Sequence, residues 1–376
     1  MAKKQKRKRR ESSYSSHLLA RVKQVCRRVG ELDLDALLVT NRFDIRYLTG
    51  FVGEDSWALL RRRSSMVHVL SDFRFREQIE REAPQAKAVM RKTSLSHELA
   101  KLAEQYGLSK IGLQADHVTL EQHKSIKKQF GGGRLSAVDD RLLAQRAIKD
   151  EKELAAIRRA VDVTQEAYLE TLKYLKHGQS EYEIAAYLEY QIRLLGADGV
   201  SFPSIVAGAT NASLPHAIPG STKVRQGDAV LFDWGAVVDG YCADLTRVVG
   251  LGGISPKIRE IYQIVLDAHD AAIEVIGPGQ QMRAVDAVAR QWIDKAGYGP
   301  EFGHALGHGI GLQIHEQPVL SSRSRGELEQ GNVVTVEPGI YLPGIGGVRI
   351  ESDVLVTRRG ARVLSDLPTD LESAII

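Results

Sequence analysis

The chain has 376 residues, long enough for two domains, and its 43% hydrophobic and 26% charged residues are typical of a globular protein. Its formal net charge of +4 depends on residues 1–10, which hold seven Lys and Arg. The other 44 basic residues are outnumbered by 47 acidic ones, so the folded part is not expected to bind nucleic acids in general.

The two cysteines, Cys26 and Cys242, do not suggest a disulfide framework, which favours a reducing compartment. No apolar run approaches the roughly 18 residues that a membrane span needs. The basic start of the chain is followed by SSYSSH and not by the apolar stretch of a signal peptide. We therefore expect a cytoplasmic protein with no membrane partner.

The first 13 residues form a block of like charge, which predicts a disordered basic tail. A solubilising role is the simplest interpretation of this tail, and contact with nucleic acid or another acidic partner is the alternative. From Ser16 onward, apolar residues at spacings of three and four predict a helix that buries Cys26.

Residues 14–145 alternate between short β-like runs and helical patterns, which predicts a small α/β domain. Its histidines have no acidic or cysteine partners at ligand spacing, so we interpret them as surface or structural residues. The expected strands are 36–40, 57–60, 66–70, 87–90 and 110–113, and the expected helices are 73–82, 95–106 and 120–130.

A second domain is predicted for residues 146–376, with the boundary near residue 145. Its first helix should begin at Glu151 and end at Gly178, where a left-handed residue is suitable. Ser180 and Glu183 then form a capping-box pair for the next helix. Two later helices are expected from Pro256 to Gly277 and from Met282 to Ala296.

Strands follow in this second domain. Two apolar runs, 229–237 and 241–249, are joined by Asp239-Gly240, a strong hairpin signal that should place Asp233 and Asp244 on adjacent strands. A further strand is expected at 348–356. Because side chains alternate along a strand, its residues Arg349, Glu351 and Asp353 should share one face.

The stretch FGHALGHGIGLQIHE, residues 302–316, holds His304, His308 and His315 among alternating glycines. Such glycines can resemble a phosphate-binding loop, but that loop needs a preceding strand, a following helix and a distal acid. The histidines can instead be read together with four carboxylates in motifs upstream and downstream of this stretch. These belong to Asp233, Asp244, Glu337 in VEPG and Glu351 in VRIES.

Four carboxylates carry a charge of about −4, which a buried site can hold only if cations compensate it. Two divalent metal ions would balance that charge. In hydrolases, two metal ions bound side by side activate water and polarise carbonyl groups. Carboxylates with one imidazole suit Mn(II) or Co(II) better than an all-nitrogen or sulfur site, and Zn(II) is the alternative.

Residues 145–360 resemble the metal-dependent pita-bread peptidases, and among them the Xaa-Pro aminopeptidases and Xaa-Pro dipeptidases. YLTGFVGEDSWALL and SDFRFREQIE resemble more loosely the smaller, creatinase-like first domain of that group. The resemblance implies an α+β fold with a C-terminal pita-bread catalytic domain after an α/β domain. It also implies five metal ligands, which are Asp233, Asp244, His308, Glu337 and Glu351.

The same resemblance implies roles for other residues. His216, in LPHA, would contact substrate near the scissile bond, His315 would stabilise the tetrahedral intermediate, and His304 would line the substrate pocket. Arg349 would link the acids, and Glu337 would also serve as general base. Two positions depart from the family pattern, because Ser352 stands where an aspartate often follows the last ligand and Val248 stands where a threonine often occurs.

The leading hypothesis is a dinuclear metal-dependent Xaa-Pro aminopeptidase acting on peptides with proline in the second position. An Xaa-Pro dipeptidase (prolidase) is the nearest alternative; Arg323 and Arg325 lie in a polar loop, and no clear carboxylate clamp appears. A non-catalytic binding module of the same fold, a metal-free hydrolase of guanidino compounds and a methionine-removing enzyme are further alternatives. The resemblance implies a homodimer or higher homo-oligomer.

Overall fold

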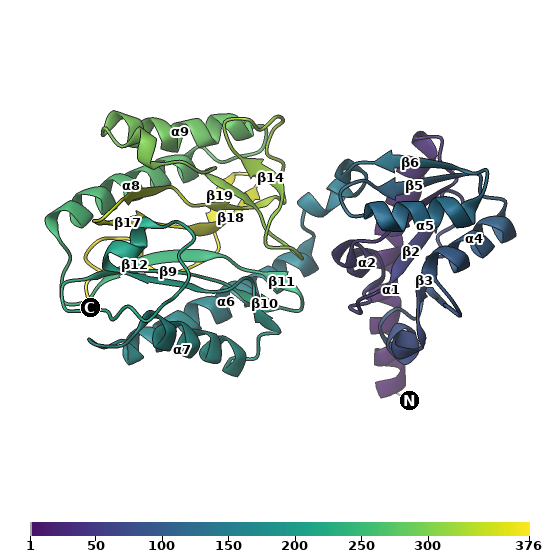
Figure 1. Cartoon of the computed structure of the whole chain (residues 1–376), viewed down its shortest axis with the longest axis horizontal. Coiled ribbons are helices and arrows are strands. Elements are labelled where there is room, and N and C mark those ends of the chain that lie inside the picture. The colour runs from purple at the N-terminus through teal and green to yellow at the C-terminus, as the bar shows by residue number, and fades with distance from the viewer. Residues whose placement is uncertain (1) are drawn as a thin grey trace. The chain divides into compact units, whose positions relative to one another are not determined.

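A computed structural model describes the backbone of residues 2–376 and the side chains of residues 16–139 and 144–376. The chain divides into two compact units, one ending at Arg146 and the other spanning Ala147–Ile376. The boundary therefore lies next to the position expected near residue 145. Figure 1 shows the chain with its helices and strands labelled.

The first unit is an α/β domain whose described residues form a six-stranded sheet in the order β4-β3-β2-β1-β5-β6. Strand β2 runs antiparallel to β1 and β3, and the other pairs are parallel. The strands are β1 (Ala36–Val39), β2 (Trp57–Arg61), β3 (His68–Ser71), β4 (Lys87–Met90), β5 (Lys110–Gln114) and β6 (Arg134–Val138). The helices are α1 (Ala2–Glu31), α2 (Arg42–Thr49), α3 (Arg76–Glu82), α4 (Leu95–Tyr106) and α5 (Leu120–Phe130), with 3-10 segments η1 (Phe73–Phe75) and η2 (Asp140–Ala147).

Side chains along the central strand β1 alternate between the two faces of the sheet, and this alternation explains how the helices pack. Ala36 and Leu38 join the apolar residues of α4 and α5 in one buried cluster. Leu37 and Val39 must point to the opposite face, and α1 contacts both β1 and β2. Cys26 of α1 is buried as predicted, and burial raises the pKa of its thiol to about 11.

The helix α2, the strand β6 and the 3-10 segment η2 were not predicted from the sequence. Helix α2 spans barely two turns, too few for a clear apolar period, although both of its ends carry sequence signals. The Asn41 side chain accepts a hydrogen bond from the Phe43 amide, and Gly50 ends the helix at a φ of 82°. Strand β6 is an edge strand whose first four residues are exposed or half-buried, so it has no apolar run.

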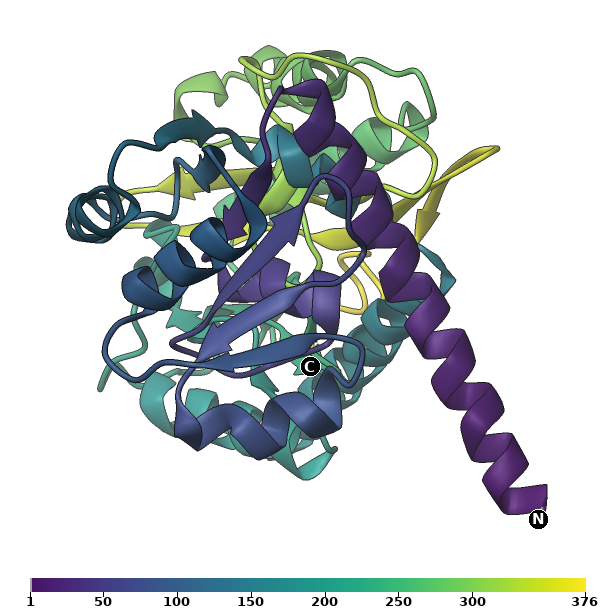
Figure 2. The same ribbon diagram turned by 90° about the vertical axis from the view of Figure 1, so that its right-hand side faces the viewer.

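The predicted disordered tail is not what the structure shows, because α1 begins at Ala2 and not near Ser16 (Figure 2). Lys, Arg and Gln all favour helical backbone, and no Gly or Pro in this segment interrupts the helix. The side chains of residues 1–15 lie outside the described part of the chain. Contact between the basic segment and nucleic acid therefore stays a prediction.

The second unit places its strands between two helix pairs, with α8 and α9 on one side and α6 and α7 on the other (Figure 1). The helices are α6 (Glu151–Tyr174), α7 (Glu181–Leu194), α8 (Pro256–Glu274) and α9 (Met282–Lys295), with 3-10 segments η3 (Ala209–Ser213) and η4 (Gly299–Glu301). The strands are β7 (Gly199–Val200), β8 (Ile205–Gly208), β9 (Ala229–Trp234), β10 (Ala236–Val238), β11 (Tyr241–Cys242), β12 (Leu245–Gly250), β13 (Gly307–Gly309), β14 (Glu316–Leu320), β15 (Val333–Val336), β16 (Gly339–Leu342), β17 (Gly346–Arg349), β18 (Ser352–Thr357) and β19 (Gly360–Val363).

These strands form small sheets in the orders β11-β10-β7, β12-β9-β8, β14-β13-β15-β18-β19 and β16-β17. One apolar cluster lies between α8, α9 and the strands, and a second lies between α6, α7 and the strands. The predicted α+β architecture, with an α/β domain first, is thus confirmed. Among the helices that the structure describes, none is both long and apolar enough to cross a membrane.

Helix ends in this unit follow their caps. Ser180 and Glu183 form the predicted capping box of α7, and Asp150 with Glu153 forms another at the start of α6. Helix α6 ends at Tyr174, before the expected Gly178, because Leu175 already has extended backbone. Gly178, at a φ of 88°, serves the turn that follows. Helix α8 likewise ends at Glu274 and not at Gly277.

The strands that carry acidic residues are more interrupted than predicted. The Asp239-Gly240 turn is present with φ angles of 50° and 76°, but each predicted strand beside it is split in two. Gly235 marks one split, since a Cβ there would lie 1.9 Å from the Ala243 carbonyl oxygen. The predicted strand 348–356 also splits, between β17 and β18. As a result, Asp244 and Glu351 both lie at breaks between strands.

Candidate metal centre

One cavity in the second unit gathers the residues that sequence analysis singled out. Its volume is about 460 Å³, and its wall includes side chains from strands, strand breaks and loops. All nine candidate residues line it, namely Asp233, Asp244, His308, Glu337, Glu351, His216, His304, His315 and Arg349. Segments more than 130 residues apart in the sequence, such as those of His216 and Glu351, therefore meet at one place.

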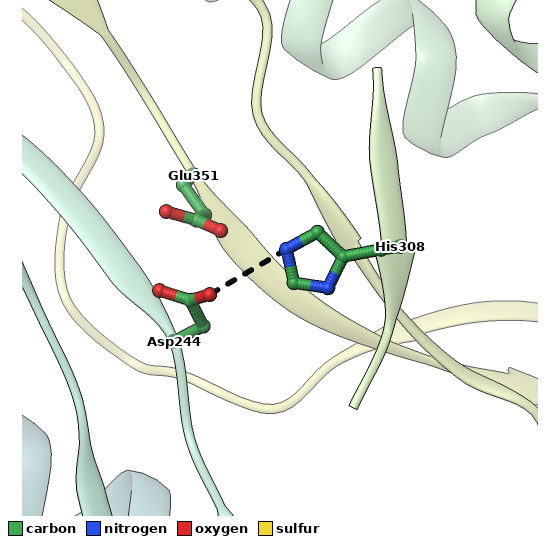
Figure 3. A group of neighbouring side chains, drawn as sticks. All are labelled: Asp244, His308 and Glu351. Carbon is green, nitrogen blue, oxygen red and sulfur yellow. Dashed lines mark ion pairs between the residues drawn. The ribbon is translucent and has the colours of Figure 1, made fainter. Parts of the chain in front are cut away.

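Three of these residues form a compact group that could hold a metal ion. One ligand atom each from Asp244, His308 and Glu351 lies within 4.8 Å of the others. Figure 3 shows the His308 ring directed at Asp244, with Glu351 beside it, and the Nε2 to Oδ2 distance is 3.7 Å. Glu337 approaches the same nitrogen, with its Oε1 3.4 Å away.

The protonation of His308 suits a ligand. Its Nδ1 lies 3.1 Å from the Gly309 carbonyl oxygen, which can only accept, so Nδ1 carries the proton. Burial lowers the pKa of the ring to about 4, so the ring is neutral near pH 7. The lone pair of Nε2 therefore faces the carboxylates. Gly307 allows β13 to approach β15 closely, since a Cβ there would lie 2.0 Å from the Thr335 carbonyl oxygen.

Arg349 connects the acids on the other side of the cavity. Its Nη2 lies 2.5 Å from Asp233 Oδ2, and its Nε donates to Thr246 Oγ1 at 3.1 Å. Thr246 in turn donates to Glu351 Oε2 at 2.6 Å. Asp233 and Thr246 are directly paired residues of β9 and β12. The orientations of Asp233 and Glu351 are therefore set together by one guanidinium and one hydroxyl.

Tyr341 is a member of the site that sequence analysis missed. Its hydroxyl accepts from Arg349 Nη1 at 2.8 Å and lies 2.9 Å from His304 Nε2. His304 Nδ1 donates to the Ala305 carbonyl oxygen at 2.8 Å, so Nε2 is the acceptor and the Tyr341 hydroxyl donates to it. Burial raises the pKa of Tyr341 to about 12 and lowers that of His304 to about 4, so both groups are neutral.

Thr246 and two more polar residues near the acids were also missed. Thr335 accepts from the His308 amide at 3.0 Å and donates to Glu337 Oε1 at 3.2 Å, so it fixes both residues. Asp353 accepts from the Asp244 amide at 3.0 Å. The period-two position of Thr335 relative to Glu337 was a possible signal, because both share one face of the chain.

The electrostatics of the acids indicate that a cation belongs among them. Burial is the main cause that raises the pKa of Asp233, Asp244 and Glu351, and it raises that of Glu337 to about 8. Within the described part of the chain, Asp233 Oδ1, Asp244 Oδ1 and Glu351 Oε1 are buried without a hydrogen-bond partner. Buried carboxylate oxygens of this kind fit divalent cations, which would favour their ionised forms.

Comparison with known proteins also indicates a metal-dependent protein. Residues 155–358 match the model of metallopeptidase family M24, and residues 21–148 match that of the creatinase/prolidase N-terminal domain. The uncharacterized peptidase YqhT of Bacillus subtilis (strain 168) is 36% identical over 342 residues, covering 91% of this chain and 96% of that protein.

Two solved structures are similar over nearly the whole chain. An Xaa-Pro dipeptidase from Bacillus anthracis superposes with a TM-score of 0.91 at 35% identity, covering 96% of this chain and 100% of that one. An X-Pro aminopeptidase from Thermotoga maritima MSB8 gives a TM-score of 0.85 at 36% identity, covering 93% and 100%. The chain therefore belongs to metallopeptidase family M24, with the pita-bread fold of that family behind a creatinase/prolidase-type N-terminal domain.

Proposed function

We propose that this protein is a dinuclear metal-dependent peptidase that releases the N-terminal residue preceding proline. The observation that carries the proposal is the set of buried carboxylate oxygens without partners beside the lone pair of His308. The five residues that would hold two ions are Asp233, Asp244, His308, Glu337 and Glu351. Bound ions would lower the pKa of a water molecule and polarise the scissile carbonyl.

Manganese is the metal that we favour. Four carboxylates and one imidazole form a hard, oxygen-rich donor set. Mn(II) and Co(II) are better suited to such a set than to a sulfur-rich site. Zn(II) is the alternative. Elemental analysis after reconstitution with Mn(II) tests this step, since two ions per chain are expected and fewer than one would contradict the dinuclear assignment.

Glu337 is the residue that we propose as general base and proton carrier. Its carboxylate lies 3.4 Å from His308 Nε2 and accepts a hydrogen bond from Thr335. Proline provides a tertiary amide nitrogen, which must gain a proton before it can leave. A carboxylate at this place can take the proton of the attacking water and then, as the carboxylic acid, deliver it to that nitrogen. His216 and His315 line the same cavity and would donate hydrogen bonds to the developing oxyanion.

The rest of the cavity wall suits an apolar ring. A prolyl side chain carries no polar group, so a protein binds it through burial and apolar contact. The apolar residues on the wall include Phe202, Pro203, Ile205, Pro215, Ile218, Pro219 and Ile314.

The charges on this wall support one of the two choices of substrate length. A dipeptide ends in a free carboxylate just after proline, so a dipeptidase needs a cation at that place. Among the described residues that line the cavity, Arg349 is the one Lys or Arg, and it is already bonded to Asp233, Thr246 and Tyr341. Arg323 and Arg325 do not belong to the lining. We therefore favour an aminopeptidase over a dipeptidase.

A comparison of two substrates tests this choice. Xaa-Pro and Xaa-Pro-Xaa-Xaa peptides would be incubated with the Mn(II)-loaded protein, and release of the first residue would be measured. We expect the longer peptide to be cleaved with the higher kcat/KM. Cleavage restricted to the dipeptide would establish a prolidase instead, and no cleavage with two ions bound would favour the binding-module hypothesis.

We also propose that the enzyme acts in the cytoplasm as a homodimer or higher homo-oligomer. Its two cysteines are both buried thiols, which suits a reducing compartment. The oligomeric state is the expectation from the family resemblance, and mass photometry of the purified protein would test it. A single species at the monomer mass would contradict it.

A further inference from the structure

A buried ion pair joins the start of the catalytic domain to the loop that carries His315. The Lys149 side chain is 0% exposed, the Glu316 side chain is 6% exposed, and their Nζ and Oε2 atoms lie 3.4 Å apart. Lysine is rarely buried so completely, because removing an ammonium group from water is costly unless a partner compensates it. A pair of this kind beside an active-site loop therefore calls for a functional explanation.

Glu316 organises the loop that precedes it. Its Oε1 accepts from the Gln313 amide at 2.9 Å, so the carboxylate holds the backbone of residues 313–316 in one turn. Gly311 leaves the space for this arrangement, since a Cβ there would lie 2.7 Å from a Glu316 carboxylate oxygen. The loop is fixed at its other end, where the Gly311 carbonyl oxygen accepts from the Cys242 amide at 2.8 Å.

Lys149 provides a fixed point on the other side. Its amide donates to the Gly331 carbonyl oxygen at 2.8 Å, and the next residue, Asp150, caps α6 through its side chain. The Lys149 side chain thus projects from backbone that is held on one side by the hydrogen bond to Gly331 and on the other by the capped N-terminus of α6. The Glu316 carboxylate is bonded to this fixed point on one oxygen and to the loop amide on the other.

His315 and Ile314 are the loop residues that face the cavity. The His315 ring lies 4.4 Å from the His308 ring, centroid to centroid, at the edge of the candidate metal centre. A shift of about 1 Å in a group of this kind can cost about a hundredfold in rate. From the contacts above we infer that Lys149 is a positioning residue, which sets the place of His315 through Glu316. This inference rests on the proposed function.

The experiment compares four variants with the wild-type protein. Lys149→Met and Glu316→Gln each break the pair while keeping side-chain size, and Lys149→Met/Glu316→Leu replaces both partners with apolar groups. Lys173→Met is the matched control, because it removes an exposed pair with Glu170 in the last turn of α6, at the other end of the helix that Lys149 precedes. For each protein, kcat and KM on an Xaa-Pro-Xaa-Xaa peptide, bound manganese and Tm would be measured.

We expect Lys149→Met and Glu316→Gln to lower kcat about 10- to 100-fold, with KM within about threefold and metal content unchanged. The double variant separates positioning from stability. Replacing both partners of a buried pair generally recovers stability, but it removes the Glu316 carboxylate that accepts from the Gln313 amide. Its Tm should return toward the wild-type value while kcat stays low. Wild-type kcat in the double variant would overturn the inference.

Amide hydrogen exchange of the segment 310–317 provides a measurement that does not depend on activity. Exchange should be faster in both single variants than in wild type and in Lys173→Met. Wild-type exchange in Glu316→Gln, the mildest change, would also overturn the inference. If the wild-type protein cleaved no Xaa-Pro peptide, the proposed function would fail, whereas the exchange data would still decide whether the pair anchors the loop.

Discussion

The two units of the chain bury carboxylates in opposite ways. In the first unit, Asp44 is 4% exposed and burial raises its pKa, but both of its oxygens have partners. Arg146 and Gln114 each donate to it at 2.6 Å. In the second unit, Asp244 and Glu351 are buried as deeply, yet each keeps one oxygen without a hydrogen-bond partner among the described residues. Burial alone therefore does not distinguish the acids that could hold a metal ion, whereas an unpartnered buried oxygen on a residue that lines the cavity does.

Substitution of one acid from each unit gives the largest expected effects. Asp244→Asn or Glu351→Gln should abolish activity, because each removes a negative charge that would hold the ions, and metal content should fall below two ions per chain. Asp44→Asn should leave metal content and kcat near wild type. It should instead lower the free energy of unfolding by about 3 to 5 kcal/mol, because Arg146 loses a buried charge partner.

Elemental analysis would measure the metal content, peptide assays would measure kcat, and chemical denaturation would measure the free energy of unfolding. His308→Ala should behave like the Asp244 and Glu351 variants, because it removes the imidazole of the same group. Full turnover with two ions bound in any of these variants would contradict the ligand assignment. Loss of metal in Asp44→Asn would remove the contrast between the two units.

His315→Ala should have a smaller effect than loss of a ligand. The ring lines the cavity but is not part of the compact group around His308, so metal content should stay near normal. We expect kcat to fall about 10²- to 10³-fold, the scale of one lost oxyanion donor. Steady-state kinetics on an Xaa-Pro-Xaa-Xaa peptide, with metal content measured in parallel, would check this. A variant that lost its metal would have to be reassigned to the ligand set.

Metal removal should change thermal stability in a pH-dependent way. Burial raises the folded-state pKa of Asp244 and Glu351, so without metal the fold loses stability as pH rises above about 4, where these acids ionise in the unfolded chain. Bound cations favour the ionised acids. The increase in Tm on adding Mn(II) should therefore be larger at about pH 8 than at about pH 5.5, and reach roughly 5 to 10 °C. Calorimetry showing the reverse order would contradict the cation site.

The smallest effect is expected from deletion of residues 1–10. The buried apolar residues of α1 that the structure describes begin at Leu18 and continue through Val22 and Val25. Removal of the basic segment should therefore leave both Tm and peptidase activity unchanged. A drop in Tm of more than about 3 °C, which corresponds to roughly 1 kcal/mol, would show that the segment packs against the folded chain.

Sequence reasoning located the cavity because its residues stand in recognisable local motifs. Helices α4 and α5 matched their expected bounds for a similar reason, since their caps and apolar periods are local signals. Tyr341, Thr246 and Asp353 were not identified as site residues because their roles arise from contacts across strand pairs. Thr246 meets Glu351 across 105 residues, and nothing in either motif specifies that distance.

The strand breaks were missed for a related reason. Runs such as 229–237 look continuous because most of their residues are apolar, whereas the break at Gly235 arises from its close approach to Ala243 across the Asp239-Gly240 hairpin. Lys149 and Glu316 form a second case. Their ion pair spans 167 residues, and either residue alone would pass for a solvated surface charge.

The hydrogen bonds of His304 have a consequence for how a peptide can meet it. Arg349 always carries its protons, so the Tyr341 hydroxyl must accept a hydrogen bond from it and donate one to His304 Nε2. The other ring nitrogen donates to Ala305. Both ring nitrogens are thus engaged within the described structure. At this position the enzyme would sense the shape of its substrate by van der Waals contact, and a substrate hydrogen-bonding group would gain nothing from the imidazole.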